Sequence, residues 1–157
     1  MGQVMIKTFR FLDKKDIGPM LDLAYKFVYE RGLAGTDFDR TAYNFTVKNW
    51  FATAAIKPLG TFIDNELIGF AMLVNDRVFY NHRHRVTLDL VYVLPKYRSA
   101  SYYQQLLDWV FDMCADKGIE IVRTSIINYV LDYNDQQNIM FENGFKQIDT
   151  IWETDAS

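Results

Sequence analysis

Cysteine, positive charge and long apolar runs are all scarce in this chain. The only cysteine is Cys114, so no disulfide can form within the chain, which fits a reducing compartment. Aspartate and glutamate total 20 residues against 17 lysines and arginines, and the net charge of −3 disfavours a general nucleic-acid-binding surface. The longest uncharged apolar run, from Leu67 to Val74, is far shorter than the ~20 residues that span a bilayer. Because the N-terminus also lacks a signal-peptide pattern, we expect a cytoplasmic protein that does not cross a membrane.

Aromatic residues, by contrast, are abundant. They make up 16% of the chain, and hydrophobic residues as a whole make up 50%. This composition predicts a globular protein with a heavily packed core or an aromatic-lined cleft. A chain of 157 residues is long enough to bury roughly 68–70% of the surface of its extended form. We therefore expect a single domain, residues 1–157, whose core needs no disulfide to stabilise it.

The stretch from Val86 to Leu107 has the pattern of a strand, a tight loop and a helix. Its first part, VTLDLVYV, is rich in β-branched and aromatic residues, which predicts a buried strand that ends at Pro95. Small and polar residues follow, and apolar residues then recur at helical spacing: Tyr103, Leu106, Leu107, Val110, Phe111 and Cys114. Such a loop directs the free N–H groups of a helix N-terminus towards the end of a strand, which is a common way of holding a phosphate.

The remaining patterns predict further strands and helices around this stretch. Asp13 is expected to cap a helix over residues 14–29, and Asp37 or Asp39 to cap a second helix that ends at Pro58. Strands are expected at residues 4–9, 61–63, 67–74, 119–127 and 145–152, with a hairpin turn at residues 64–66 and a short last helix over residues 134–144. The order of these elements predicts an α/β (α+β) fold.

The segment from Asp76 to Arg85 is polar and basic and leads into the central strand. His82 and His84 have the spacing that places two imidazoles on one face of a strand, where they could share a metal, although no third ligand is close in the sequence. The segment could instead be a solvated hairpin tip, or a surface that attracts an acidic partner or the phosphates of a cofactor. We expect Cys114 to be a packed residue of an apolar helix face rather than a nucleophile.

Three motifs, taken in order, resemble the GNAT superfamily of N-acetyltransferases, and the resemblance covers essentially the whole chain. LVYVLPKYRSASYYQQLL resembles the family's acetyl-CoA loop at the strand, the proline, Arg98 and the following leucine pair. IMFENGF resembles the family's last helix and strand through Gly144 and Phe145, and FRFLDKKDIGPML resembles its opening strand and first helix. The resemblance implies a mixed, mostly antiparallel sheet of six or seven strands flanked by four helices.

Three positions depart from the family's pattern. Counted from Arg98, Ser101 and Tyr103 stand where the family has glycines, which let backbone approach the pyrophosphate closely. If the family's motif is aligned two residues earlier, Ser99 and Ser101 take the two glycine positions. This alignment loses the match to the arginine and rotates the helix by about 200° relative to its leucines. Met140 takes the place of a tyrosine that protonates the leaving thiolate in many members, and a thioether cannot donate that proton.

The resemblance also implies a site for acetyl-CoA as acetyl donor, together with an amine acceptor. Acetyl transfer needs a base for the amine, a donor for the oxyanion and an acid for the thiolate. Asp89 matches a position where members often have a general base, although a sheet-edge carboxylate bonded to backbone is the alternative; Tyr133 is the candidate acid. The implied cofactor-binding residues are Val91, Val93, Arg98, Ser99, Ala100, Ser101, Tyr102, Tyr103 and Asn134.

Some of these residues also have a purely structural interpretation. The backbone of Val91 and Val93 is expected to pair with the pantetheine arm, which the family inserts where the strand ending near Pro95 splays from the strand ending near Ile127. On a regular strand Asp89 shares its face with these two valines. Tyr102 and Tyr103 have an alternative role in packing and helix capping.

Two functions remain open from the sequence. The first is an acetyl-CoA-dependent N-acetyltransferase that acts on a small amine or on a protein lysine or N-terminal amine. The second is a GNAT-fold pseudoenzyme that has lost cofactor binding and binds a protein partner through its aromatic and basic surface. The glycine replacements and Met140 favour the second, whereas the overall resemblance favours the first.

Overall fold

The computed structural model describes residues 7–33, 35, 37–124 and 131–148. In chain order, the strands and helices of this part are β1 (Lys7–Phe11), α1 (Ile17–Glu30), α2 (Arg40–Ala52), β2 (Ile56–Ile63), β3 (Glu66–Arg77), β4 (His84–Val93), α3 (Ala100–Lys117), β5 (Ile121–Thr124) and α4 (Tyr133–Glu142). Short 3-10 helices precede α1 (Lys14–Asp16) and α3 (Pro95–Tyr97). None of the helices formed by these residues combines the length and apolarity that a bilayer-spanning helix needs.

The described strands form one sheet in the order β1-β2-β3-β4-β5. All neighbouring pairs are antiparallel except β4 and β5, which are parallel. The predicted mixed, mostly antiparallel sheet is therefore confirmed, with five described strands instead of the six or seven expected. A sixth strand was predicted at residues 145–152, but residues 145–148 are not in a strand and residues 149–152 lie outside the described residues.

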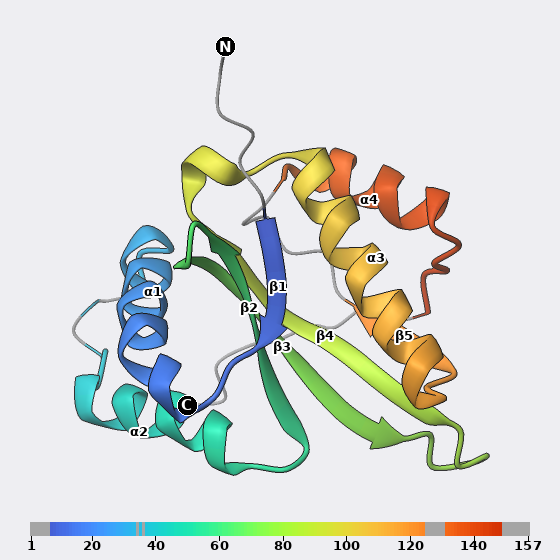
Figure 1. Cartoon of the computed structure of the whole chain (residues 1–157), viewed down its shortest axis with the longest axis horizontal. Coiled ribbons are helices and arrows are strands. Elements are labelled where there is room, and N and C mark those ends of the chain that lie inside the picture. Colours follow the sequence, from blue (N-terminus) through green and yellow to red (C-terminus); the bar gives the residue numbers. More distant parts are fainter. Residues whose placement is uncertain (1–6, 34, 36, 125–130, 149–157) are drawn as a thin grey trace.

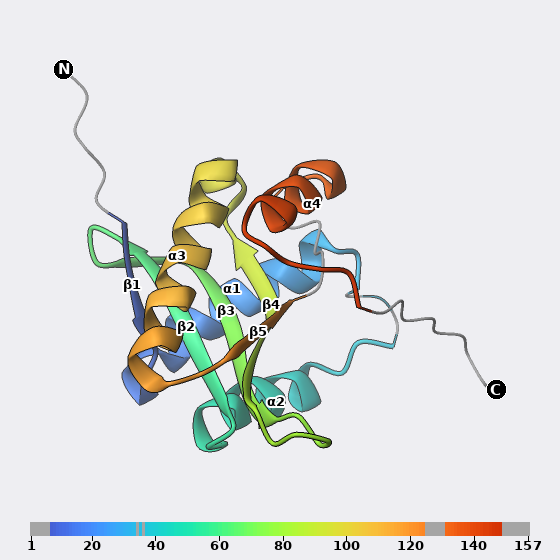
Figure 2. The ribbon, with the colours of Figure 1, turned by 90° about the vertical axis from the view of Figure 1, so that its right-hand side faces the viewer.

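Two helices cover each face of the sheet. Figure 1 shows α1 and α2 on one side and α3 and α4 on the other, and in Figure 2 the second pair lies in front of the sheet. The core is accordingly split into two clusters, of which one joins α1 and α2 to the sheet and the other joins α3 and α4 to it. Strand β4 contributes to both, because Tyr92 packs in the first cluster while Val91 and Val93 pack in the second.

The first helix begins as its capping residues predict. The Asp13 carboxylate accepts a hydrogen bond from the N–H of Lys15, and the Asp16 carboxylate accepts one from the backbone N–H of Asp13, as part of a capping box. Asp16 also accepts two hydrogen bonds from the Arg10 guanidinium, at 2.8 and 2.9 Å. These hydrogen bonds hold the pKa of the Asp16 carboxyl below its ordinary value.

The end of the second helix differs from the prediction. Asp39 caps α2 as expected, but the helix ends at Ala52, and Pro58 lies inside β2 rather than at the helix end. Pro58 opposes Met72 of β3, and its carbonyl accepts a hydrogen bond from Leu12 at 2.8 Å. Because a hydrogen-bonded antiparallel pair exchanges two N–H···O bonds, the missing N–H of Pro58 leaves one bond to Leu12 unmade at the end of the β1–β2 ladder, whereas the β3 side of the strand is unaffected.

The hairpin between β2 and β3 confirms the predicted turn. Asp64 and Asn65 both have positive φ, at 50° and 66°. A two-residue hairpin loop of type I′ needs positive φ at both central positions, and aspartate and asparagine tolerate it better than most residues.

Candidate functional site

Strand β4 contains an irregularity at the predicted general base. Ala71 of β3 pairs with Val91, but Leu73 pairs with Leu88, so that Asp89 and Leu90 together oppose a single residue of β3. This is a β-bulge, which shifts the alternation of side chains by one residue. The prediction that Asp89 shares a face with Val91 and Val93 is therefore wrong, since both valines are buried whereas Asp89 is exposed.

The alternative interpretation of Asp89 was a sheet-edge carboxylate that is hydrogen-bonded to a neighbouring backbone group. Among the described residues, no hydrogen bond or ion pair involves its side chain. An exposed carboxylate on a bulge is accessible to a molecule that approaches the end of β4. Bulges are frequent beside active sites because they redirect a side chain at the sheet surface.

Beyond the bulge, the backbone of β4 has hydrogen-bonding groups directed away from β3. Leu94 donates its N–H to Ile68 at 3.0 Å, so Val93 and Gly69 form a non-hydrogen-bonded pair. By the alternation of an antiparallel ladder, the N–H and C=O groups of Val93 and Val91 then point to the β5 side. The described pairing between β4 and β5 runs from Arg85 to Leu88 and does not reach these two valines. The predicted splay itself involves residues up to 127, of which 125–127 lie outside the described residues.

The β4–α3 loop presents a helix N-terminus. Ser99 caps α3 by accepting a hydrogen bond from the N–H of Tyr102 at 3.0 Å. Ala100 and Ser101, the first two helical residues, are exposed, and their N–H groups have no acceptor within the helix. The Ser101 hydroxyl accepts a hydrogen bond from Gln105. This end of the helix therefore offers a small polar surface with a partial positive charge.

Arg98, the arginine of the loop motif, is bound to two other parts of the chain. Its Nε donates to the carbonyl of Val93 at 2.9 Å, and its two terminal nitrogens donate to the carboxylate of Glu30 at 2.6 and 2.8 Å. Arg98 thereby lowers the pKa of the Glu30 carboxyl, which lies at the end of α1. The Tyr92 hydroxyl also bonds to Glu30, and burial raises the pKa of this tyrosine to about 12. Sequence reasoning missed Glu30, because nothing local links two residues 68 positions apart.

Tyr102 and Tyr103 are core residues. Each is 1% exposed. The Tyr102 hydroxyl lies 2.7 Å from the hydroxyl of Thr61, and burial raises its pKa to about 12. The Tyr103 hydroxyl bonds to Thr124 of β5. These residues were predicted either to bind the cofactor or to pack and cap the helix. The structure places both side chains in the core, and only their backbone remains close to the loop surface.

The start of α4 combines two exposed residues with one that is buried without partners. Asp132 caps the helix, Tyr133 is 51% exposed and Asn134 is exposed. Gln136 is 1% exposed, and neither polar atom of its side-chain amide has a hydrogen-bond partner among the described residues. Such a group is costly, because the amide has lost its water without gaining a replacement.

Gln136 was missed by the sequence reasoning, although a signal for it exists. It lies three residues before Ile139, and the two are the only buried residues of α4. A helical projection of the segment therefore places the glutamine on the apolar face. Because Ile139 packs in the cluster that joins α3 and α4 to the sheet, this face of α4 is turned towards α3 and the sheet.

The geometry does not support the metal alternative for His82 and His84, and it places Cys114 in the core as expected. His82 lies in a turn with a φ of 57°, whereas His84 begins β4, so the two imidazoles do not share one strand face as the spacing suggested. Within the described ranges, no group of three or more histidine, cysteine or acidic residues is placed to hold a metal. Burial raises the pKa of the Cys114 thiol, which disfavours the reactive thiolate.

Comparison with known proteins identifies the family. The profile of the acetyltransferase (GNAT) family matches residues 24–145. The fold is similar to that of a ribosomal-protein-alanine N-acetyltransferase from Brucella melitensis, with a TM-score of 0.72 and 13% identity over 96% of this chain and 99% of that chain. An aminoglycoside N-acetyltransferase in complex with CoA is similarly close, with a TM-score of 0.71 and 16% identity over 100% and 99% of the two chains.

A protein from Clostridium acetobutylicum, described as a predicted acetyltransferase and solved with acetyl-CoA, has a TM-score of 0.70 and 15% identity over 96% of each chain. At such identities the similarity shows the fold alone. No curated protein matches the chain. The family profile, however, spans both the β4–α3 loop and α4, and on this ground the chain belongs to the acetyltransferase (GNAT) family.

Proposed function

We propose that this protein is an acetyl-CoA-dependent N-acetyltransferase that acts on a small amine or on a protein lysine or N-terminal amine. The observation that carries the proposal is the end of β4, where the backbone groups of Val91 and Val93 are directed away from β3. The Val93 carbonyl already accepts a hydrogen bond from Arg98, but the N–H of Val93 and both backbone groups of Val91 suit a strand-like ligand such as the pantetheine arm, whose amides could pair with them. The family membership of the chain supports the same interpretation.

The β4–α3 loop fits the phosphate end of such a ligand. The exposed residues Ala100 and Ser101 offer backbone N–H groups at the positive end of α3, which attracts an anion. Tyr103 replaces a glycine of the family's motif, but its side chain is buried among core residues and so does not cover the outside of the loop. Arg98 remains beside the loop, with its guanidinium held by Glu30.

Gln136 supports the middle of the proposed site. A primary amide contains both a donor and an acceptor, and each pantetheine amide also has one of each. A ligand amide next to α4 would therefore relieve the buried and unpartnered side chain of Gln136.

Two further residues have proposed chemical roles. Acetyl-CoA supplies the acetyl thioester. Asp89, exposed on the bulge, is proposed to accept a proton from the acceptor amine, and Tyr133 at the start of α4 to donate one to the departing thiolate sulfur. The acid role of Tyr133 stays a prediction, because the only support for it is the tyrosine's half-exposed position at the start of the helix.

The test measures binding and transfer separately. Millimolar acetyl-CoA is expected to raise the melting midpoint by several degrees, since a ligand at 100 times its Kd stabilises the native state by about 2.7 kcal/mol. Release of the CoA thiol is then followed with a panel of small amines and amine-terminated peptides. A chain that neither shifts with acetyl-CoA nor releases thiol with any acceptor refutes the proposal.

A second candidate function rests on one observation. The guanidinium of Arg98 is already engaged by Glu30 and by the Val93 carbonyl, which leaves little of it for a phosphate. This favours a protein of the family that has lost acetyl-CoA and binds a protein partner instead. The absence of any thermal shift with acetyl-CoA, together with a folded chain, would support this candidate over the enzyme.

A further inference from the structure

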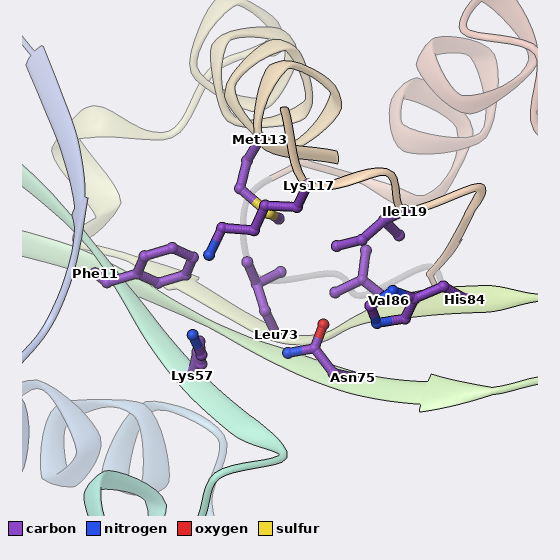
Figure 3. A pocket seen from close by; sticks show the side chains of 9 residues that line it. All are labelled: Phe11, Lys57, Leu73, Asn75, His84, Val86, Met113, Lys117 and Ile119. Carbon is purple, nitrogen blue, oxygen red and sulfur yellow. The ribbon is translucent and has the colours of Figure 1, made fainter. Parts of the chain in front are cut away.

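A pocket lies at the end of α3 opposite the β4–α3 loop. It encloses about 170 Å³ between the sheet and the last turn of the helix. Leu73, Val86 and Ile119 contribute apolar side chains to it, as does Met113 of α3 (Figure 3). The residues of α3 that line this pocket, Met113 and Lys117, lie 13 and 17 positions after Ala100, which is roughly 20–26 Å along the helix at 1.5 Å per residue. The pocket therefore does not belong to the proposed acetyl-CoA site.

Two lysines give the pocket its charge. Figure 3 shows the side chains of Lys57, from β2, and Lys117, from the end of α3, both close to the ring of Phe11. Their ammonium nitrogens lie 5.5 and 5.2 Å from the centroid of the Phe11 ring. Neither ammonium forms an ion pair with a carboxylate in the described part of the chain, and no described residue that lines the pocket is acidic.

Such an arrangement is complementary to an anion. Two cations that share one aromatic ring repel each other, and a negative group placed between them replaces this repulsion with attraction. Asn75 and His84, both half-buried at the edge of the pocket, add groups that can hydrogen-bond to a polar ligand. The apolar side chains favour a ligand with a hydrocarbon part, because burying it removes apolar surface from water.

We propose that this pocket binds a small monocarboxylate with a short apolar chain. The carboxylate lies between Lys57 and Lys117, and the chain contacts Leu73 and Val86. The pocket is smaller than the ~300 Å³ typical of sites for drug-sized molecules, so the ligand is correspondingly small. Because both lysines are exposed, salt screens the attraction, and the affinity falls as the ionic strength rises.

The test uses hexanoate as the probe and hexanol as its uncharged counterpart. Calorimetric titration of the full chain in phosphate-free buffer of low ionic strength is expected to give saturable binding of hexanoate, with a Kd in about the millimolar range. Hexanol is expected to bind at least about tenfold more weakly, because it lacks the charge. Equal binding of the two compounds overturns the proposal, as does the absence of hexanoate binding.

Variants locate the binding. Lys57→Gln and Lys117→Gln are each expected to weaken hexanoate binding by about tenfold, the effect of one charge-assisted contact. Lys48→Gln is the matched control, because this exposed lysine lies on α2 at the opposite face of the sheet. Full affinity in the double variant Lys57→Gln/Lys117→Gln, or competition between hexanoate and acetyl-CoA, would place the ligand elsewhere and overturn the proposal.

Discussion

Replacing Gln136 with methionine tests whether its buried amide is there to meet a ligand. Methionine has nearly the shape of glutamine but no strong hydrogen-bonding groups. Because both amide atoms of Gln136 are buried without partners among the described residues, the substitution removes a desolvation penalty of about 1–3 kcal/mol. At about 2–4 °C per kcal/mol for a chain of this size, Gln136→Met is expected to raise the melting midpoint of the free protein by several degrees.

The same substitution is expected to weaken acetyl-CoA binding. Losing one hydrogen-bonded amide contact costs roughly 1.4 kcal/mol, or a tenfold rise in Kd. At a ligand concentration of 100 times the parent's Kd, the stabilisation by acetyl-CoA then falls from about 2.7 to about 1.4 kcal/mol. The variant is therefore expected to be more stable than the parent without acetyl-CoA and to gain less from it.

Melting curves of parent and variant, with and without acetyl-CoA, measure both effects. Gln137→Met is the matched control, since Gln137 is the next residue of α4 and is only half-buried, and it is expected to change neither quantity by more than a few tenths of a kcal/mol. A Gln136→Met protein that is less stable than the parent would show that the amide has partners. The reasoning about the ligand would then be refuted as well.

Three other perturbations test the site and the fold. Asp89→Asn is expected to lower turnover by about 10²–10⁴-fold, most strongly at low pH, where the amine depends most on a base, and to leave acetyl-CoA binding unchanged; a fully active variant contradicts this. Arg98→Ala is expected to reduce the thermal shift that acetyl-CoA causes. Glu30→Gln is expected to increase this shift, because Glu30 competes with the phosphates for the Arg98 guanidinium. Equal shifts in both variants argue against contact between Arg98 and the phosphates of acetyl-CoA. Asp16, whose pKa is lowered by Arg10, stabilises the native state above its unfolded pKa. Asp16→Asn is therefore expected to be less stable at neutral pH, with a difference that shrinks as the pH falls below the ordinary value of 3.8 and is measured by denaturation at several pH values.

The sequence predicts those parts of the fold that depend on local chemistry. Asp39 and Ser99 cap helices because a short acceptor side chain can satisfy an N–H of the first turn. Gly118 ends α3 with a φ of 67°, a conformation that costs glycine little. Pro58 shows the limit of such local rules. A proline can end a helix or lie in a strand, and which of the two occurs depends on the neighbouring strands, which the sequence around Pro58 does not reveal.

The parts of the site that the sequence does not predict depend on distant contacts. A bulge at Asp89 changes which face of β4 each residue occupies, and it is visible only in the pairing with β3. The Glu30–Arg98 ion pair joins the end of α1 to the β4–α3 loop, which pattern reasoning cannot bring together. Burial of Gln136 likewise depends on how α4 packs against α3 and the sheet.

The family's glycine at position 103 cannot be restored in this chain without cost to the fold. Tyr103 is 1% exposed and packs between α3 and the sheet, so its removal leaves a large cavity at about 3–5 kcal/mol, to which glycine adds about 1 kcal/mol of helix propensity. That sum approaches the whole stability of a typical domain, about 5–15 kcal/mol. Ser101, by contrast, is exposed, so Ser101→Gly costs only the propensity. We therefore expect Ser101→Gly to fold and Tyr103→Gly to lose its cooperative melting transition, as followed by circular dichroism. A Tyr103→Gly protein that melts like the parent would mean that the tyrosine is not a core residue.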